Sequence, residues 1–377
     1  MGPMRVMETG RLGSGEAGKQ EAGKTPQLDL LPSTPASPLP ILDQRARGTR
    51  FIKLSVRSVL NSPASTHMGF WSINPYVGCE FGCTYCYARD THRWVVERQG
   101  GGAAGQMSSN NMSKAPLPAW EAFEKEILVK SDVAEVLTRT LNPTRLAGSS
   151  LVIGTATDPY QPAERRFRLT RRILDVLRSY HGLSIEIITK SPLVARDIDL
   201  LQALSRHNEV NVNISLATAD PRLARRLELR SPVPAARLRA LRRLTVGGIY
   251  AGLIVAPIIP GITDDWAGLA RLMEAAKEAG ARYVIGSALR LGPAARHRFL
   301  PILEREFPEL YERYRRHYST SDMASRSYQD ALIRRLNALR QAYGFAGDEA
   351  SSRRRRRLED AERLPDTSRS AEQAVLL

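Results

Sequence analysis

The chain has 377 residues, which is enough for one large domain or for two of ordinary size. Its composition is globular, and it lacks an apolar run near the roughly 18 residues of a membrane span, so we expect no membrane insertion. Three cysteines and an N-terminus without an apolar signal sequence argue against a secreted disulfide scaffold and predict a cytoplasmic protein.

The formal net charge is +16, and most of it lies in the middle of the chain. Residues 1–45 contribute a net charge of 0 and residues 351–377 a net charge of +2, which leaves +14 on residues 46–350. A basic surface of this size suits a polyanion such as nucleic acid. However, 47 of the 55 basic residues are arginines, as a GC-rich coding bias would also produce, so charge alone leaves both interpretations open.

The ends of the chain differ in composition from its middle. Residues 1–45 are rich in Gly, Pro and Ser without periodicity, which predicts a disordered leader. We expect a core domain over 46–320, a C-terminal helical extension over 321–350 and a disordered charged tail over 351–377. Within the core, residues 100–118 are poor in apolar side chains and predict a surface excursion.

Helical and strand patterns alternate through the core. A short strand at 71–76 leads into a helix from about Tyr87, and helical patterns follow at 120–129 and 132–141. Further strands are expected at 150–154, 184–189, 210–216, 249–256 and 282–288, and further helices at 170–180, 197–205, 234–246, 266–279, 296–316 and 327–343. Strands that are each followed by a helix predict an α/β fold with a parallel sheet. The alternation alone fits either a partial TIM-type (β/α)6 barrel or a flat doubly wound sheet.

All three cysteines lie in one loop after the first strand of this series. Cys79, Cys83 and Cys86 have the spacing C-x3-C-x2-C. An odd number of thiols cannot pair off internally, so the loop indicates a metal centre with one coordination position open. The alternative is a zinc knuckle with His92 as fourth ligand. Such motifs normally have a second pair of ligands, which is absent from this sequence.

Polar residues follow several of the other strands. Thr157 and Asp158 come after the second strand, Lys190 after the third and Ser215 at the end of the fourth. Because function collects at the carboxyl ends of parallel strands, we expect these side chains to share one site with the cysteine loop. Each residue alone is also explained by a turn or by a solvated strand end.

Four stretches together resemble a known family. They are Cys79-x3-Cys83-x-Tyr85-Cys86-Tyr87, residues 154–164, residues 189–191 with 196–200, and residues 256–261. The chain resembles the radical S-adenosylmethionine (SAM) superfamily over about residues 50–320, and within it the spore photoproduct lyase-like (DNA repair photolyase-like) group. The resemblance implies a partial (β/α)6 barrel that holds a [4Fe–4S] cluster on the three cysteines. It also implies SAM bound at the fourth iron, where reduction cleaves SAM to a 5′-deoxyadenosyl radical.

The resemblance also implies a set of SAM contacts. They are Tyr85, Thr157, Asp158, Lys190, Ser215, Ile258 and Pro260. Lys190 suits the SAM carboxylate, since it is a point charge in an arginine-dominated chain. Glu164 and Arg237 are better explained as surface charges.

The sequence departs from spore photoproduct lyase itself in one respect. That enzyme uses a cysteine outside the cluster as hydrogen-atom donor, whereas all three cysteines here belong to the cluster motif. Tyr76, Tyr87 and Tyr160 are the candidates for a hydrogen-atom relay in its place. The same lack of further cysteines disfavours a second iron–sulfur cluster.

These observations predict a radical SAM enzyme of the lyase or transferase type. Nucleic acid is the expected substrate, with DNA repair as the role, and a one-electron donor such as flavodoxin or ferredoxin is the expected partner. The alternatives are a radical SAM enzyme for a small molecule or peptide, and a non-enzymatic metal-containing protein that binds nucleic acid.

Overall fold

The computed structural model describes residues 41–45, 48–66, 68–91 and 117–345, and the structural statements below refer to these ranges. They all belong to one unit of the chain, Pro38–Leu377. The predicted tail, residues 1–40 of the predicted leader and residues 100–116 of the predicted excursion lie outside the described residues. The division of the core at residue 320 stays a prediction.

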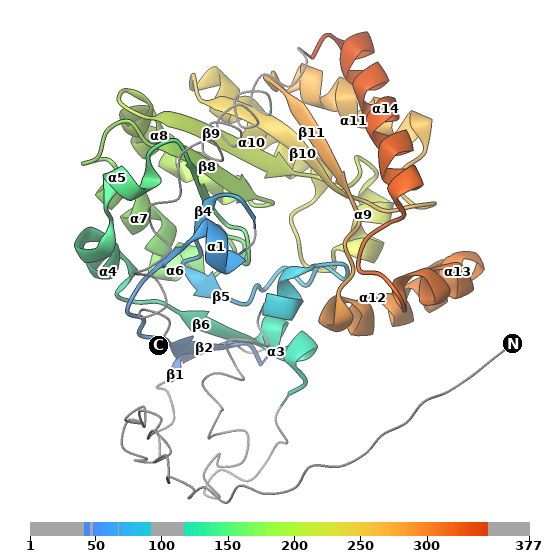
Figure 1. The fold of residues 1–377 in the computed structure, drawn as a ribbon, viewed down its shortest axis with the longest axis horizontal. Coiled ribbons are helices and arrows are strands. Elements are labelled where there is room, and N and C mark those ends of the chain that lie inside the picture. Colours follow the sequence, from blue (N-terminus) through green and yellow to red (C-terminus); the bar gives the residue numbers. More distant parts are fainter. Residues whose placement is uncertain (1–40, 46–47, 67, 92–116, 346–377) are drawn as a thin grey trace, which may run out of the picture. The chain divides into compact units, whose positions relative to one another are not determined.

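The fold is organised around a seven-stranded sheet in the order β11-β10-β9-β8-β7-β4-β3 (Figure 1). Its parallel strands are β4 (Trp71–Ile73), β7 (Ser150–Ile153), β8 (Ser184–Thr189), β9 (Glu209–Ser215), β10 (Tyr250–Ile258) and β11 (Val284–Ala288). The edge strand β3 (Leu60–Asn61) pairs antiparallel with β4. The parallel order confirms the α/β class and agrees with a partial (β/α)6 barrel.

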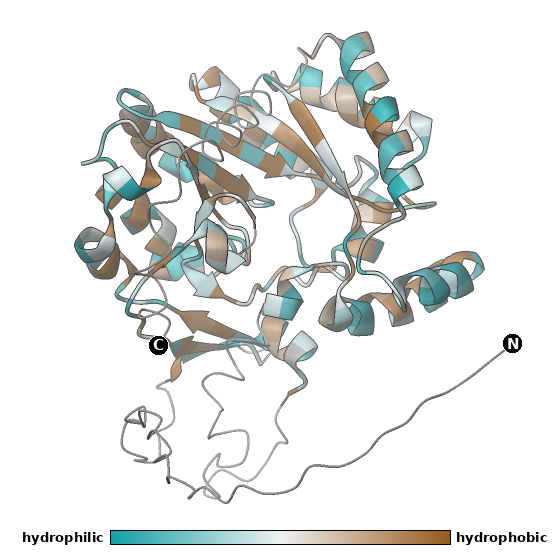
Figure 2. Cartoon of the chain, viewed as in Figure 1, coloured by the Kyte–Doolittle hydropathy of each residue, from teal (hydrophilic) through white to brown (hydrophobic). Residues whose placement is uncertain are grey.

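Helices follow the parallel strands and pack against the sheet. Apolar side chains of the strands and of the helices form the main core between them. These helices are α6 (Glu164–Phe167), α7 (Leu169–Leu177), η1 (Pro192–Asp197), α8 (Ile198–Ser205), α9 (Pro221–Leu227), α10 (Pro234–Val246) and α11 (Trp266–Glu278). In β9, Val210, Val212 and Ile214 alternate with polar residues and belong to the main apolar core. Figure 2 shows the resulting apolar colouring along the strands of the sheet.

A second, four-stranded sheet was not predicted. It has the order β1-β2-β6-β5, with β1 (Ile41–Gln44), β2 (Arg50–Lys53), β6 (Glu126–Val129) and β5 (Tyr76–Val77). Two expectations are corrected here. Residues 41–44 form a strand although they were placed in the leader, and the helix predicted over 120–129 ends at Lys125 as α3 (Ala119–Lys125). Residues 126–129 are extended because their backbone pairs with β2 on one side and with β5 on the other, and the side chains of 127–129 are buried.

Two further helices stand where one was predicted over 296–316. They are α12 (Pro293–Glu306) and α13 (Pro308–Tyr318). The break falls before Pro308, because proline lacks the N–H that would continue the helix and restricts the residue before it. The remaining helices are α1 (Pro63–Thr66), α4 (Val133–Thr140), α5 (Pro143–Leu146) and α14 (Arg326–Tyr343). No helix in the described ranges has the length and apolar character needed to cross a bilayer.

Candidate active site

The cysteine loop begins directly after β5. Its thiols are free, with Cys79 and Cys83 buried and Cys86 partly exposed. Gly78 starts the loop in the left-handed region, at φ +90°, and a Cβ there would lie 2.8 Å from the backbone carbonyl of Phe123. Only glycine fits this turn, because both its φ and the close approach of the backbone exclude a side chain.

Backbone hydrogen bonds fix the loop on two sides. The amide of Cys79 donates to the carbonyl of Phe123 at 2.8 Å, at the end of α3. On the other side, the amide of Thr84 donates to the carbonyl of Leu227 at 3.0 Å. Cys83 also forms a β-bridge with Glu228, just after α9. The positions of the thiols are therefore set by segments distant in sequence.

Gln161 is a site residue that the sequence analysis missed. Its side chain is fully buried, and its amide nitrogen donates to the carbonyl of Gly78 at 3.1 Å. Its amide oxygen accepts from the backbone N–H of Glu80 at 3.0 Å. Thr157, predicted to contact SAM, donates its hydroxyl to the same Gly78 carbonyl at 2.6 Å. In this structure both side chains hold the cysteine loop from the end of β7.

A buried ion cluster underlies the same loop. Arg89 is fully buried, pairs with Glu124 and donates to the carbonyl of Cys83 at 2.8 Å. Glu124 also pairs with Arg230 and Arg298. Burial acts to raise the pKa of Glu124, but the three guanidinium groups outweigh it and hold that pKa below its ordinary value. The loop therefore packs on a cluster of ion pairs in which the carboxylate of Glu124 is charged.

Three predicted SAM contacts, Lys190, Ser215 and Tyr85, come together at the cysteine loop. The ammonium of Lys190 donates to the hydroxyl of Ser215 at 2.7 Å and lies 5.7 Å from the centre of the Tyr85 ring. The carboxylate of Glu228 is 3.9 Å away, beyond hydrogen-bond distance. Among the described residues, the ammonium thus has one acceptor, and most of its N–H donors are free for a ligand.

Near Lys190 lies a buried hydrogen-bond network around Glu228, which the sequence analysis missed. The hydroxyl of Tyr85 and the guanidinium of Arg237 both donate to the carboxylate of Glu228. Arg237 also donates to the carbonyl of Ser215 at 3.0 Å. Burial acts to raise the pKa of Glu228, but Arg237 and then Lys190 lower it more strongly, so the carboxylate is charged.

The expected surface location of Arg237 is therefore wrong, since its side chain is 1% exposed. The sequence held one weak signal for this network: Glu228 is the lone acid among several arginines at 222–230.

Three other predicted SAM contacts, Asp158, Ile258 and Pro260, have partners within the protein. Asp158 accepts from the hydroxyl of Thr189 and from the amide of Lys190, each at 2.7 Å. Ile258 is fully buried in the main core. The carbonyl of Pro260 accepts from the hydroxyl of Tyr314 at 2.6 Å.

Two of the three tyrosines proposed for a hydrogen-atom relay, Tyr76 and Tyr160, lie near the same Glu164. Tyr76 is buried and donates to Glu164 at 2.6 Å. Glu164 is itself fully buried, which corrects its expected surface location. Tyr160 is also buried, next to Asp197, whose charge adds to burial in raising the pKa of the phenol. Tyr87 follows Cys86 in the loop; it is 39% exposed, and its hydroxyl donates to the carbonyl of Thr155.

The thiols fit a multi-iron cluster better than a single ion. No three His, Cys, Asp or Glu side chains among the described residues are grouped to hold one metal ion, and His92 of the zinc alternative lies outside those residues. Zinc would draw its sulfurs to about 2.3 Å from one centre, whereas a [4Fe–4S] cluster spreads its thiolates over separate irons.

The electrostatics of the loop also favour a bound metal centre. Burial, followed by the charge of Glu228, raises the pKa of Cys83 to about 12, and burial followed by Asp158 raises that of Cys79 well above its ordinary value. Such thiols ionise only against a strong positive charge, which iron supplies.

Comparison with known proteins finds relatives that match most of this chain. The chain is 32% identical over 303 residues to the uncharacterized protein Rv2578c of Mycobacterium tuberculosis, covering 80% of this chain and 83% of that protein. It is 27% identical over 270 residues to the uncharacterized protein MJ0683 of Methanocaldococcus jannaschii, covering 69% of this chain and 85% of that protein.

Among solved structures, the fold resembles a mutant of spore photoproduct lyase with bound AdoMet and dinucleoside spore photoproduct. The TM-score is 0.51 at 13% identity, with 78% of this chain and 79% of that chain covered. The sequence model of the radical SAM superfamily matches residues 73–273, which is more than half of the chain. The protein therefore belongs to the radical SAM superfamily.

Proposed function

We propose that this enzyme reductively cleaves S-adenosylmethionine and uses the resulting radical on a nucleic acid. Radical SAM enzymes use a [4Fe–4S] cluster and SAM, and the cluster supplies the electron that breaks the sulfonium C–S bond to give a 5′-deoxyadenosyl radical. One observation carries the proposal: three free thiols lie in one clamped loop beside Lys190, a lysine with unused N–H donors.

The chain's own residues take distinct roles in this proposal. Cys79, Cys83 and Cys86 hold the cluster as thiolates. Lys190 binds the carboxylate of SAM, and Ser215 orients Lys190 through their hydrogen bond. Tyr85 offers its ring face beside the ammonium, held in place by its hydroxyl contact with Glu228. Thr157 and Asp158 support the loop and the strand ends from behind.

Nucleic acid is the substrate class that we favour. The net charge of +14 on residues 46–350 supports it, because phosphate backbones bind through arginine and lysine. The likeness in fold to a lyase solved with a dinucleoside photoproduct also supports it. A cysteine donor is absent, so we assign any hydrogen-atom return to Tyr87, which is next to Cys86 and exposed.

The experiment is an anaerobic cleavage assay with and without DNA. The protein is loaded with iron and sulfide, then mixed with SAM and dithionite, and 5′-deoxyadenosine is measured by chromatography. Cluster-loaded protein that forms no 5′-deoxyadenosine would refute the radical SAM activity. Ultraviolet-damaged DNA, undamaged DNA and RNA are then added in separate reactions. We expect one of them to raise the yield and to be altered, as detected by mass spectrometry.

An absence of any effect of nucleic acid would instead favour a small molecule or peptide as substrate. Cleavage of SAM in that case would still support the radical chemistry. The cytoplasmic location and the need for flavodoxin or ferredoxin remain predictions of the same proposal.

A further inference from the structure

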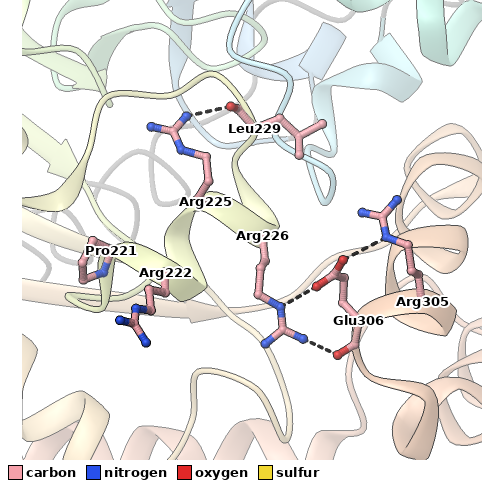
Figure 3. A pocket seen from close by; sticks show the side chains of 7 residues that line it. All are labelled: Pro221, Arg222, Arg225, Arg226, Leu229, Arg305 and Glu306. Atoms are coloured by element: carbon pink, nitrogen blue, oxygen red, sulfur yellow. Dashed lines mark hydrogen bonds and ion pairs between the residues drawn. The ribbon is translucent and has the colours of Figure 1, made fainter.

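An arginine-lined pocket lies beside the segment that holds the cysteine loop (Figure 3). Its lining residues are Pro221, Arg222, Arg225, Arg226, Leu229, Arg305 and Glu306. The lining holds four guanidinium groups and one carboxylate, which sum to a formal charge of +3. This excess positive charge attracts anions.

Three of these four arginines have partners within the protein, and one of the three is Arg305, which pairs with Glu306 at 2.8 Å. Arg226 pairs with Glu306 and lies 4.0 Å from the centre of the Phe307 ring, so it joins α9 to the end of α12. Arg225 donates to the carbonyl of Leu229 at 2.7 Å. Arg222 is exposed, and within the described part of the chain its guanidinium has no hydrogen-bond or ion-pair partner. Its charge is therefore available to a partner.

The pocket is separated from the cysteine loop by one short segment. Leu229 lines the pocket, and the residue before it, Glu228, forms the β-bridge with Cys83. The carboxylate of Glu228 is directed to Tyr85 and Arg237, on the side where Lys190 and Ser215 lie. The pocket is thus next to the chain that holds Cys83, and it contains none of the residues that we assign to SAM.

We infer that this arginine pocket is the docking site of an acidic one-electron carrier protein, such as a flavodoxin or ferredoxin. In this complex the carrier's reduced flavin or iron–sulfur centre gives up one electron, and the cysteine-bound cluster takes up that electron. An acidic carrier complements the charge of +3. The inference rests on the proposed one-electron chemistry.

The location favours a carrier over a nucleic-acid substrate. An electron donor must approach the cluster, and the pocket adjoins the segment bridged to Cys83. A substrate must instead approach the SAM carbon that becomes the radical, on the side of Lys190.

The test reverses the charge of exposed arginines. Substituting them leaves no buried carboxylate without a partner. Arg222→Glu and the double variant Arg222→Glu/Arg305→Glu are compared with wild type, and Arg271→Glu on α11 is the matched control. Binding of an acidic flavodoxin to the cluster-loaded protein is measured by anaerobic titration calorimetry at low and high salt. The rate of cluster reduction by photoreduced flavodoxin is followed by visible absorbance, with dithionite as a small reductant that needs no docking.

We expect the double variant to bind flavodoxin on the order of tenfold more weakly at low salt, with a smaller loss at high salt. Reduction of the double variant by flavodoxin should slow in parallel, whereas its reduction by dithionite should keep the wild-type rate. The Arg271→Glu control should match wild type in flavodoxin binding and in both reduction rates. Unchanged flavodoxin binding would overturn the inference. So would weaker binding of DNA by the double variant with flavodoxin binding intact, because the pocket would then belong to nucleic acid.

Equal slowing with dithionite would also overturn the inference, since it would place the effect in the cluster itself. Wild-type protein that fails to cleave SAM with dithionite would count against the proposed function instead, and flavodoxin binding would be judged separately.

Discussion

Replacing Lys190 by methionine tests the proposed SAM site most directly. The change removes the ammonium and keeps most of the apolar side chain. Within the described residues the ammonium makes one hydrogen bond, to Ser215, and Glu228 is already paired with Arg237. Loss of Lys190 therefore leaves no buried carboxylate without a cation. We expect the fold to survive and the effect to fall on SAM binding.

The size of the effect follows from the bond that is lost. A hydrogen bond to a charged group contributes about 1.5–3 kcal/mol, and about 1.4 kcal/mol corresponds to a tenfold change in affinity. Lys190→Met should therefore raise the Kd for SAM roughly 10- to 150-fold. Ser215→Ala removes only a neutral partner and should raise the Kd roughly 2- to 10-fold.

The measurement is equilibrium dialysis of SAM against anaerobic, cluster-loaded protein, with thermal melting as a check on folding. Lys277→Met, an exposed lysine on α11, is the matched control. A Kd within twofold of wild type for Lys190→Met would refute the assignment of Lys190 to the SAM carboxylate. A normal Kd with a markedly lower melting temperature would show that Lys190 serves only the buried network around Glu228.

Three further predictions concern the cluster and the buried charges. Cys86→Ala removes one of the three proposed iron ligands, so reconstituted protein should lose its visible cluster absorbance and its 5′-deoxyadenosine formation; retention of both would refute the ligand set. Arg237→Met leaves Glu228 buried without its main cation and should cost about 3–5 kcal/mol in urea unfolding of the cluster-free protein, and Glu228→Gln in the same chain should recover much of the loss; strictly additive costs would contradict the pairing. Burial lowers the pKa of Lys130 from 10.5 to about 8, so the folded state binds fewer protons than the unfolded state between these values and stability rises with pH. At about 1.4 kcal/mol per pH unit, Lys130→Met should raise the free energy of unfolding by about 3 kcal/mol at pH 7 and by progressively less towards pH 10. Urea unfolding at several pH values measures this gain, and a gain independent of pH would contradict the burial argument.

The fold was predictable where the information is local. In β9, Val210, Val212 and Ile214 alternate with polar residues, and this period indicates a strand without knowledge of its neighbours. The small sheet was not predictable in the same way. Residues 126–129 continue the helical pattern of α3, and only their pairing with β2 and β5 makes them extended.

The cysteine motif was also visible because its residues lie close together in the sequence. The groups that hold it were not visible. Gln161 reaches Glu80 across 81 positions, and Glu228 reaches Tyr85 across 143. Arginine is usually a surface residue, and this chain has 47 arginines. Nothing in the sequence shows that Arg237 is the one that pairs with the buried carboxylate of Glu228.

Asp158 shows how such long-range contacts change the chemical interpretation of a motif. The sequence suggests a SAM ligand, but its carboxylate accepts from the Lys190 amide and from the Thr189 hydroxyl, both at the end of β8. These bonds fix the direction in which Lys190 leaves the strand. The lysine can then reach Ser215 and the face of Tyr85 with donors to spare. In the proposed site, Asp158 therefore acts on SAM binding indirectly, because it orients Lys190, the residue that we assign to the SAM carboxylate.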